Sequence, residues 1–240
     1  MKLFDATPGR VIDALRTMYP SRLEVVGSTK RHLDTTRTTF GYVLEGNPTL
    51  VVGGLDRFQL SEGFYFSVPG EYTLEAAGCV VVVIERYGFR GLLNVGRIED
   101  KGRLSYIDGC SDTLLVSPPR QGDPCLNYLH FPPGIDQTQH THPSIRFGVV
   151  ARGAGVAYQA KGPQGDGWEE ALTAGKVFLL EEQELHSFRT TRLPEGVESP
   201  RMDIIAFHPD TDWGPTDQLH PMLNRTYIGT TPTPGGQYQQ

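Results

Sequence analysis

The sequence predicts an all-β protein made of two antiparallel barrels, with a short helix at the N-terminus. Short segments rich in β-branched and aromatic residues recur along the chain, and turn residues separate them. Glycine (28) and proline (18) are plentiful among the 240 residues, as such turns require. The pattern of the first half returns in the second half, so two similar β units are expected.

The expected domains follow from this repeat. The chain between Tyr87 and about Gln121 is less regular and rich in polar residues, and it is interpreted as the crossing between the two halves. The predicted segments are an N-terminal helical segment (1–22), a first barrel (23–110), a second barrel (111–225) and a disordered tail rich in Pro, Thr, Gly and Gln (226–240).

The helix is expected from about Pro8 to Met18. Thr7 can cap its first turn, and a proline suits the first helical position. Apolar residues recur at helical spacing and Pro20 ends the segment. The apolar positions are Val11, Ile12, Leu15 and Met18.

Composition narrows the classes of function. The formal charge of −6 and the pI near 5.6 leave no basic footprint, which argues against nucleic acid and anionic membrane surfaces as partners. The longest apolar run, Val80 to Ile84, is too short to cross a bilayer, and the N-terminus lacks the apolar core of a signal peptide. The three cysteines have no CxxC spacing. A cytoplasmic protein that binds a small molecule is expected.

The chemistry is concentrated in one stretch, from Pro133 to Arg146. His140 and His142 are one residue apart, so in an extended segment their side chains share a face. Neutral imidazole is a common ligand of transition metals. The pattern indicates a metal site built on strands; two exposed histidines in a loop are the alternative interpretation.

The spacing around these histidines resembles the two motifs of the cupin superfamily. The first motif is matched by Gly134, five residues, His140-x-His142, three residues, a fourth position, six residues and Gly153. The second is matched by Gly175, five residues, a Glu-x-Gln sequence where Pro-x-Gly is usual, two residues and His186. The resemblance covers about residues 125–210 well and about 23–88 weakly, so the whole chain resembles a bicupin.

This resemblance implies small antiparallel β-barrels (double-stranded β-helices) and a divalent metal held by His140, His142 and His186. The glutamate usual in the first motif is replaced by Arg146, which has no free acceptor and cannot ligate a cation. A three-histidine site follows, confined to the second barrel. In the first barrel, the aligned positions are Leu33, Thr35 and one near Leu74, so that barrel is expected to be degenerate.

Arg146 is the candidate catalytic and substrate-binding residue, because a guanidinium can hold a carboxylate in a bidentate pair. Its alternative role is structural, in an interface or in an ion pair with Glu181 or Glu182. Tyr128 and His130 share a face of the preceding strand and are the other substrate-binding candidates. Three further histidines are noted: His208 as a candidate fourth ligand, and His32 and His220 as loop residues.

Three-histidine cupins that resemble this arrangement include dioxygenases that use iron(II) and oxygen. The favoured function is therefore a mononuclear non-haem iron(II) dioxygenase acting on a small polar, anionic molecule, with Zn, Mn, Ni or Cu as alternative metals. A metal-dependent isomerase, epimerase or lyase is the second hypothesis, and a non-enzymatic small-molecule-binding cupin is the third. A homodimer is expected from the habit of the family.

Overall fold

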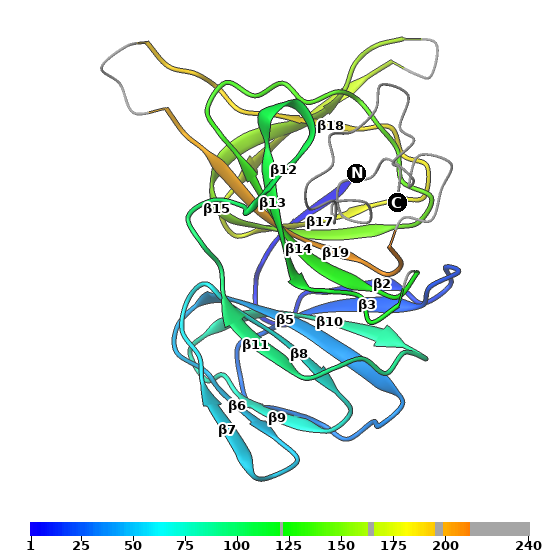
Figure 1. Cartoon of the computed structure of the whole chain (residues 1–240), viewed down its shortest axis with the longest axis vertical. Coiled ribbons are helices and arrows are strands. Elements are labelled where there is room, and N and C mark those ends of the chain that lie inside the picture. Colours follow the sequence, from blue (N-terminus) through cyan, green and yellow to red (C-terminus); the bar gives the residue numbers. More distant parts are fainter. Residues whose placement is uncertain (121, 163–165, 195–198, 212–240) are drawn as a thin grey trace, which may run out of the picture.

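The computed structural model describes residues 1–120, 122–162, 166–194 and 199–211. The regular elements in these residues are all β-strands, apart from one 3-10 turn, η1 (Ile107–Gly109). All strand pairs are antiparallel. The strands form two barrels stacked along the long axis of the molecule (Figure 1). The all-β prediction is confirmed.

The N-terminal barrel consists of two sheets. The six-stranded sheet has the order β11-β8-β5-β10-β3-β2, and the four-stranded sheet has the order β4-β9-β6-β7. The strands are β2 (Val11–Ala14), β3 (Ser21–Val26), β4 (Lys30–His32), β5 (Arg37–Glu45), β6 (Thr49–Val52), β7 (Asp56–Gln59), β8 (Phe64–Pro69), β9 (Tyr72–Glu75), β10 (Val80–Tyr87) and β11 (Asn94–Arg97).

The C-terminal barrel is built from one nine-stranded sheet of order β1-β17-β15-β19-β14-β13-β12, with β16 and β18 paired to the long, bent β15. The strands are β1 (Lys2–Asp5), β12 (Leu104–Ser105), β13 (Ser111–Val116), β14 (Cys125–Phe131), β15 (Arg146–Gln159), β16 (Trp168–Thr173), β17 (Lys176–Leu180), β18 (Ser187–Arg189) and β19 (Met202–His208). The N-terminal β1 thus pairs with β17 rather than with its neighbours in sequence.

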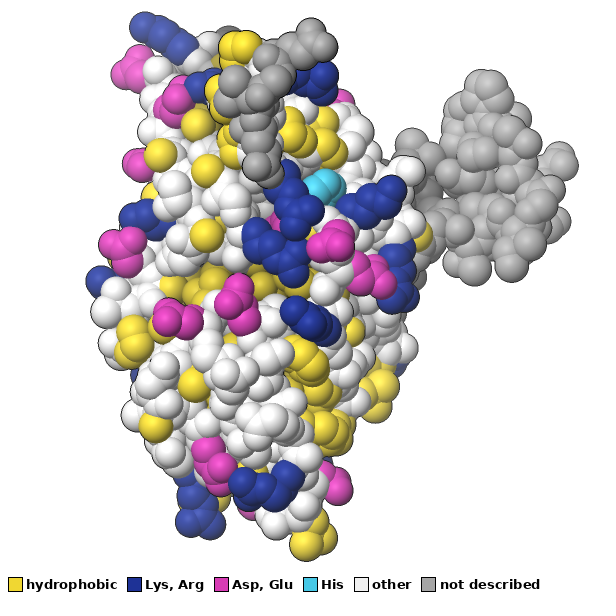
Figure 2. Space-filling view, turned by 90° about the vertical axis from the view of Figure 1, so that its left-hand side faces the viewer, with side chains coloured by type: hydrophobic (Ala, Val, Ile, Leu, Met, Phe, Trp, Pro, Cys, Tyr) yellow, Lys and Arg dark blue, Asp and Glu magenta, His cyan; other side chains and the backbone are white. Residues whose placement is uncertain are grey.

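Three hydrophobic clusters hold this architecture together. One lies within the N-terminal barrel, one within the C-terminal barrel, and the largest contains residues of both. In the shared cluster, the rings of Phe40 and Phe207 lie 5.0 Å apart, joining β5 to β19. On the face shown in Figure 2, charged side chains of both signs are interspersed over both barrels. Because the barrels share a core, the N-terminal barrel supports the other directly.

The predicted N-terminal helix is wrong. Val11–Ala14 forms β2, which pairs with β3, and burial alternates along it, with Ile12 and Ala14 buried and their neighbours exposed. Burial therefore repeats every two residues, as in a strand. Of the apolar residues interpreted as one face of a helix, Val11 and Ile12 belong to β2, and Leu15 and Met18 belong to the turn that follows it. Pairing with β3 supplies the backbone hydrogen bonds that a helix would otherwise have made.

The internal repeat is visible in one packing detail. In β5, a Cβ on Gly41 would lie 2.1 Å from the ring of Phe66 in β8. In β15, a Cβ on Gly148 would lie 2.0 Å from the ring of Phe178 in β17. Each glycine and phenylalanine are direct partners across their strand pair. These two pairs therefore mark equivalent positions in the two barrels.

Two further expectations concern membrane-spanning helices and the C-terminal tail. No helix in the described residues is long and apolar enough to span a membrane. The tail predicted to be disordered (226–240) and His220 lie outside the described residues.

Candidate metal centre

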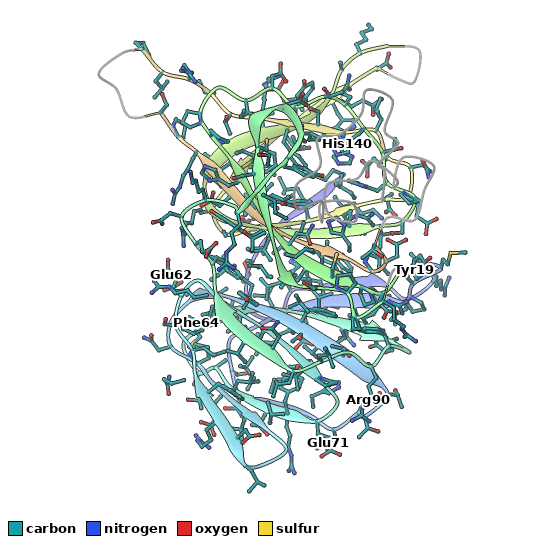
Figure 3. The ribbon with its side chains drawn as sticks, in the orientation of Figure 1. Tyr19, Glu62, Phe64, Glu71, Arg90 and His140 are labelled. Carbon is teal, nitrogen blue, oxygen red and sulfur yellow. The ribbon has the colours of Figure 1, made fainter. Side chains whose placement is uncertain are left out.

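Three histidines of the C-terminal barrel come together in a single cluster. Ligand atoms of His140, His142 and His186 all lie within 4.8 Å of one another. His140 and His142 precede β15, and His186 directly precedes β18. The backbones of His140 and His186 exchange two N–H to carbonyl hydrogen bonds of 3.0 Å each, which sets the two imidazoles side by side. Figure 3 shows His140 in this barrel.

The orientation of two rings is set by backbone carbonyls. The Nδ1 atom of His140 lies 2.9 Å from the carbonyl oxygen of Thr138, and Nδ1 of His186 lies 2.9 Å from that of Glu184. A carbonyl oxygen only accepts, so Nδ1 carries the proton in both rings and Nε2 carries the lone pair. In His186 this Nε2 atom is buried and has no hydrogen-bond partner among the described residues.

The surroundings keep these imidazoles neutral. Burial lowers the pKa of His140, and it lowers the pKa of His186 well below its usual value. The positive charge of Arg146 lowers both pKa values further. A neutral imidazole is the form that binds a metal, so the fold itself favours the metal-binding form of these two histidines.

The turn before His186 is held in an unusual backbone conformation. Gln183 stands where the second cupin motif has glycine, and its φ of +56° lies in the left-handed region. Its N–H donates to the carbonyl oxygen of His142 at 2.8 Å, and its side-chain oxygen accepts from the Thr141 hydroxyl at 3.1 Å. The glutamine thus ties the His186 turn to the His142 segment.

The histidines line a small cavity of about 30 Å³. Its apolar wall consists of Leu129, Phe131, Phe178, Leu180, Phe188, Ile204 and Ala206. Its polar lining consists of Tyr106, Gln137, Arg146 and His208 together with the three histidines. The ring of His208 lies 6.0 Å from that of His142, and His208 is outside the ligand cluster. The volume suits an ion with one or two water-sized ligands.

Arg146 lies in the wall of this cavity and is 2% exposed. Its Nη1 atom donates to the carbonyl oxygens of Ser144 (3.1 Å) and Ile145 (2.7 Å) and to the Ser144 hydroxyl (2.6 Å). The same atom lies 3.6 Å from a carboxylate oxygen of Asp210. Asp210 is therefore a charge partner of Arg146 among the described residues, whereas Glu181 pairs with Lys2. The sequence offered no signal for the pairing of Arg146 with Asp210.

Tyr128 and His130 do not line the cavity. Side chains alternate along β14, and it is Leu129 and Phe131 that face the histidines. Tyr128 is buried in the core shared by the barrels, and Nδ1 of His130 lies 2.7 Å from the buried carboxylate of Asp203.

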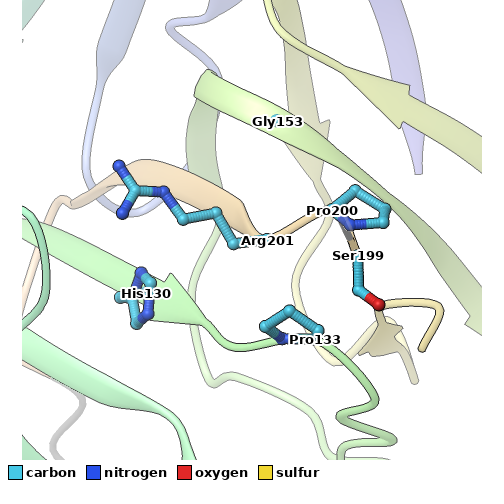
Figure 4. A pocket seen from close by; sticks show the side chains of 6 residues that line it. All are labelled: His130, Pro133, Gly153, Ser199, Pro200 and Arg201. Carbon is cyan, nitrogen blue, oxygen red and sulfur yellow. The ribbon is translucent and has the colours of Figure 1, made fainter. Parts of the chain in front are cut away.

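His130 instead borders a separate open pocket of about 790 Å³ (Figure 4). The other residues that line it are Pro133, Gly153, Ser199, Pro200 and Arg201. The two substrate-binding candidates thus share a face of β14, as expected, but that face points away from the metal cluster.

The N-terminal barrel has polar residues at the position that corresponds to the histidine cluster. The pair that corresponds to His140 and His186 across the strands is His32 and Tyr72, which face each other in β4 and β9 with ring centroids 5.1 Å apart. His32 is thus buried in a strand rather than in a loop. The alignment on Leu33, Thr35 and Leu74 missed this pair for two reasons. The turn before His186 is longer than the turn before Tyr72, and His140 lies eight residues before Gly148 whereas His32 lies nine before the equivalent Gly41.

A carboxylate, that of Glu85, lies beside this pair. Counted from the equivalent glycines, Glu85 in β10 corresponds to His208 in β19. Its Oε1 atom lies 3.4 Å from Nδ1 of His32 and 3.5 Å from Nζ of Lys30, and its Oε2 atom lies 2.8 Å from Nη1 of Arg37. Ion pairs thus fill the position that the histidine cluster takes in the other barrel.

Fold and site together define the class of protein: the chain has the cupin fold, with three histidines gathered in its C-terminal barrel. A cupin 2 conserved barrel domain protein from Leptotrichia buccalis is similar at 13% identity and a TM-score of 0.57, covering 86% of this chain and 95% of that chain. No protein-family model matches the chain, and no curated protein matches it in sequence.

Two structures of enzymes are also similar. Salicylate 1,2-dioxygenase from Pseudoaminobacter salicylatoxidans has 14% identity and a TM-score of 0.57, with 84% of this chain and 72% of that chain covered. Oxalate decarboxylase from Bacillus subtilis, described with Mn(II) centres, has 12% identity and a TM-score of 0.55, with 91% and 80% covered. At these identities the similarity establishes the fold.

Proposed function

We propose that the protein is a metal-dependent cupin enzyme, and specifically a mononuclear non-haem iron(II) dioxygenase acting on a small polar molecule. The observation that carries the proposal is the histidine cluster itself. Its ligand atoms lie within 4.8 Å of one another, and the buried Nε2 of His186 has no partner among the described residues. Three neutral nitrogen donors suit a divalent transition metal and leave part of its coordination sphere open.

The roles of the residues follow from their positions. His140, His142 and His186 would hold the ion, which when bound supplies a redox centre or Lewis acid at the cavity. Arg146 contributes a permanent positive charge to the cavity wall, which favours an anionic substrate and adds to burial in lowering the pKa of His140 and His186. The phenylalanine and leucine side chains give the cavity an apolar wall.

Two of the similar structures support an enzyme of this kind. One is a dioxygenase and the other a decarboxylase, and salicylate and oxalate are both small carboxylic acids. The second supports the alternative, a metal-dependent lyase that consumes no oxygen. The three cysteines, Cys79, Cys110 and Cys125, are buried and are not joined in disulfides, which agrees with a reducing, cytoplasmic location. A homodimer is part of the proposal and rests on family habit.

Elemental analysis of protein purified without chelators tests the metal site. One equivalent of a divalent metal is expected per chain, and His186→Ala should lose it. A matched control is His130→Ala, which removes an imidazole from the other face of β14 and should leave the metal content unchanged. Metal retained in His186→Ala would refute the site.

The reaction type is tested separately. For any small carboxylic acid that the metal-loaded protein converts, oxygen uptake should match product formation, and turnover should stop without oxygen. Undiminished anaerobic turnover would exclude the dioxygenase and favour the isomerase or lyase.

A further inference from the structure

Gln137 is a polar residue of the metal cavity that the sequence motifs do not include. It lies three residues before His140, where the chain runs antiparallel to the segment that ends in β18, and its N–H donates to the carbonyl oxygen of Phe188 at 2.9 Å. The hydroxyl of Ser187 donates to its backbone carbonyl. These contacts fix the backbone, and the side chain lines the same cavity as the histidines.

The side-chain oxygen of Gln137 has no hydrogen-bond partner among the described residues. Gln137 is 3% exposed and its Oε1 atom is fully buried. Burying an amide oxygen without a partner is costly, so such atoms in native proteins are usually met by a water or a ligand. The cavity is large enough to hold that partner beside an ion.

The nature of the partner follows from the chemistry of Oε1. A carbonyl oxygen only accepts hydrogen bonds, so its partner must carry a proton. A second buried atom of the cavity without a hydrogen-bond partner among the described residues is Nε2 of His186, which bears a lone pair and suits a cation. Within one cavity, Nε2 of His186 thus suits a metal ion and Oε1 of Gln137 suits a proton donor.

We propose that Gln137 would hold, through Oε1, a proton-bearing ligand of a metal bound at the three histidines, either water or a hydroxyl, amine or thiol group of the substrate. This inference rests on the proposed metal site and narrows its substrate class. A molecule that offers no proton at that position is disfavoured, because it leaves the amide oxygen buried without a partner.

The test uses the Co(II)-loaded full chain and azide, a small anion without a proton that displaces metal-bound water. Azide affinity is read from the visible absorption of Co(II). Gln137→Leu removes the hydrogen bond that stabilises the metal-bound water. Azide should therefore displace this water more easily and bind about fivefold to tenfold more tightly than in the wild type, as expected for one net hydrogen bond. A merely structural role would leave azide affinity unchanged or lower it.

Gln139→Leu is the matched control. Gln139 lies in the same segment but outside the cavity lining, where its Oε1 accepts from the N–H of Ala160 at 2.7 Å. Its azide affinity should equal that of the wild type. If Gln137→Leu does not fold, Gln137→Met serves instead: it also removes the amide acceptor, so azide should again bind about fivefold to tenfold more tightly than in the wild type.

The outcomes separate the two proposals. Failure of the wild type to bind Co(II) refutes the metal site and this inference with it. Normal Co(II) binding with unchanged or weaker azide affinity in Gln137→Leu refutes this inference alone. Weaker Co(II) binding and an altered Co(II) spectrum in azide-free Gln137→Leu would make Gln137 a direct ligand, and would also overturn it.

Discussion

Replacing Glu85 by glutamine should destabilise the N-terminal barrel through the loss of one buried charge. The carboxylate is 6% exposed and is surrounded by His32, Lys30 and Arg37. The hydroxyl of Tyr87 lies 3.1 Å from its Oε2 atom. Glutamine keeps the shape of the side chain but removes one of the two carboxylates that pair with Lys30 and with Arg37, whose other partners are Glu24 and Asp34.

The magnitude follows from the pKa of the carboxyl group. Burial alone raises the pKa of Glu85, but the hydrogen bond from His32 and the charges of Lys30 and Arg37 outweigh it and lower the pKa from 4.5 to about 2. One pKa unit corresponds to about 1.4 kcal/mol, so the ionised state contributes about 3 kcal/mol to stability at neutral pH. Because the folded pKa is the lower one, this contribution is present above about pH 4.5 and is lost as the pH falls towards 2.

Urea unfolding followed by circular dichroism at pH 7, 5 and 3 measures this effect. Glu85→Gln should lose about 3 kcal/mol at pH 7, and its difference from the wild type should shrink at pH 3. Glu75→Gln is the control, because Glu75 pairs with Arg57 at 2.9 Å on the surface, where such pairs contribute about 1 kcal/mol or less. A loss below about 1 kcal/mol for Glu85→Gln, or a difference independent of pH, would refute the reasoning.

Three further predictions concern the C-terminal barrel. Gln183→Gly should raise the free energy of unfolding by about 1 kcal/mol, since glycine adopts a φ of +56° without strain; a lower melting temperature would contradict this. Gly148→Ala should lower it by about 2 kcal/mol or more in urea unfolding, because the new Cβ would lie 2.0 Å from the Phe178 ring, and wild-type stability would show that the ring can move aside. His142→Ala should bind Co(II) at least tenfold more weakly by titration, whereas His130→Ala should bind as the wild type does; equal affinities would exclude His142 as a ligand.

The metal ligands could be predicted from sequence because their geometry is local. In His140-x-His142 the spacing alone sets both side chains on one face, and the glycines around His186 mark the turns of a repeating strand pattern. The all-β class could be predicted for the same reason, since turn residues and β-branched segments act over a few positions. The helix failed because a period of two and a period of 3.6 are hard to distinguish over four residues, and pairing with β3 decided the outcome.

The tertiary structure decided every feature that depends on contacts between distant residues. Nη1 of Arg146 lies 3.6 Å from a carboxylate oxygen of Asp210, and Glu85 pairs with Lys30 in β4 and Arg37 in β5, at sequence separations that no local pattern encodes. The face of β14 that meets the cavity also depends on packing: sequence shows that Tyr128 and His130 share a side, but not which side is inward. Gln137 could be recognised only once its buried oxygen and the histidine cluster were seen in the same cavity. Periodicity and spacing are properties of the chain, whereas burial and charge pairing arise when the barrel closes.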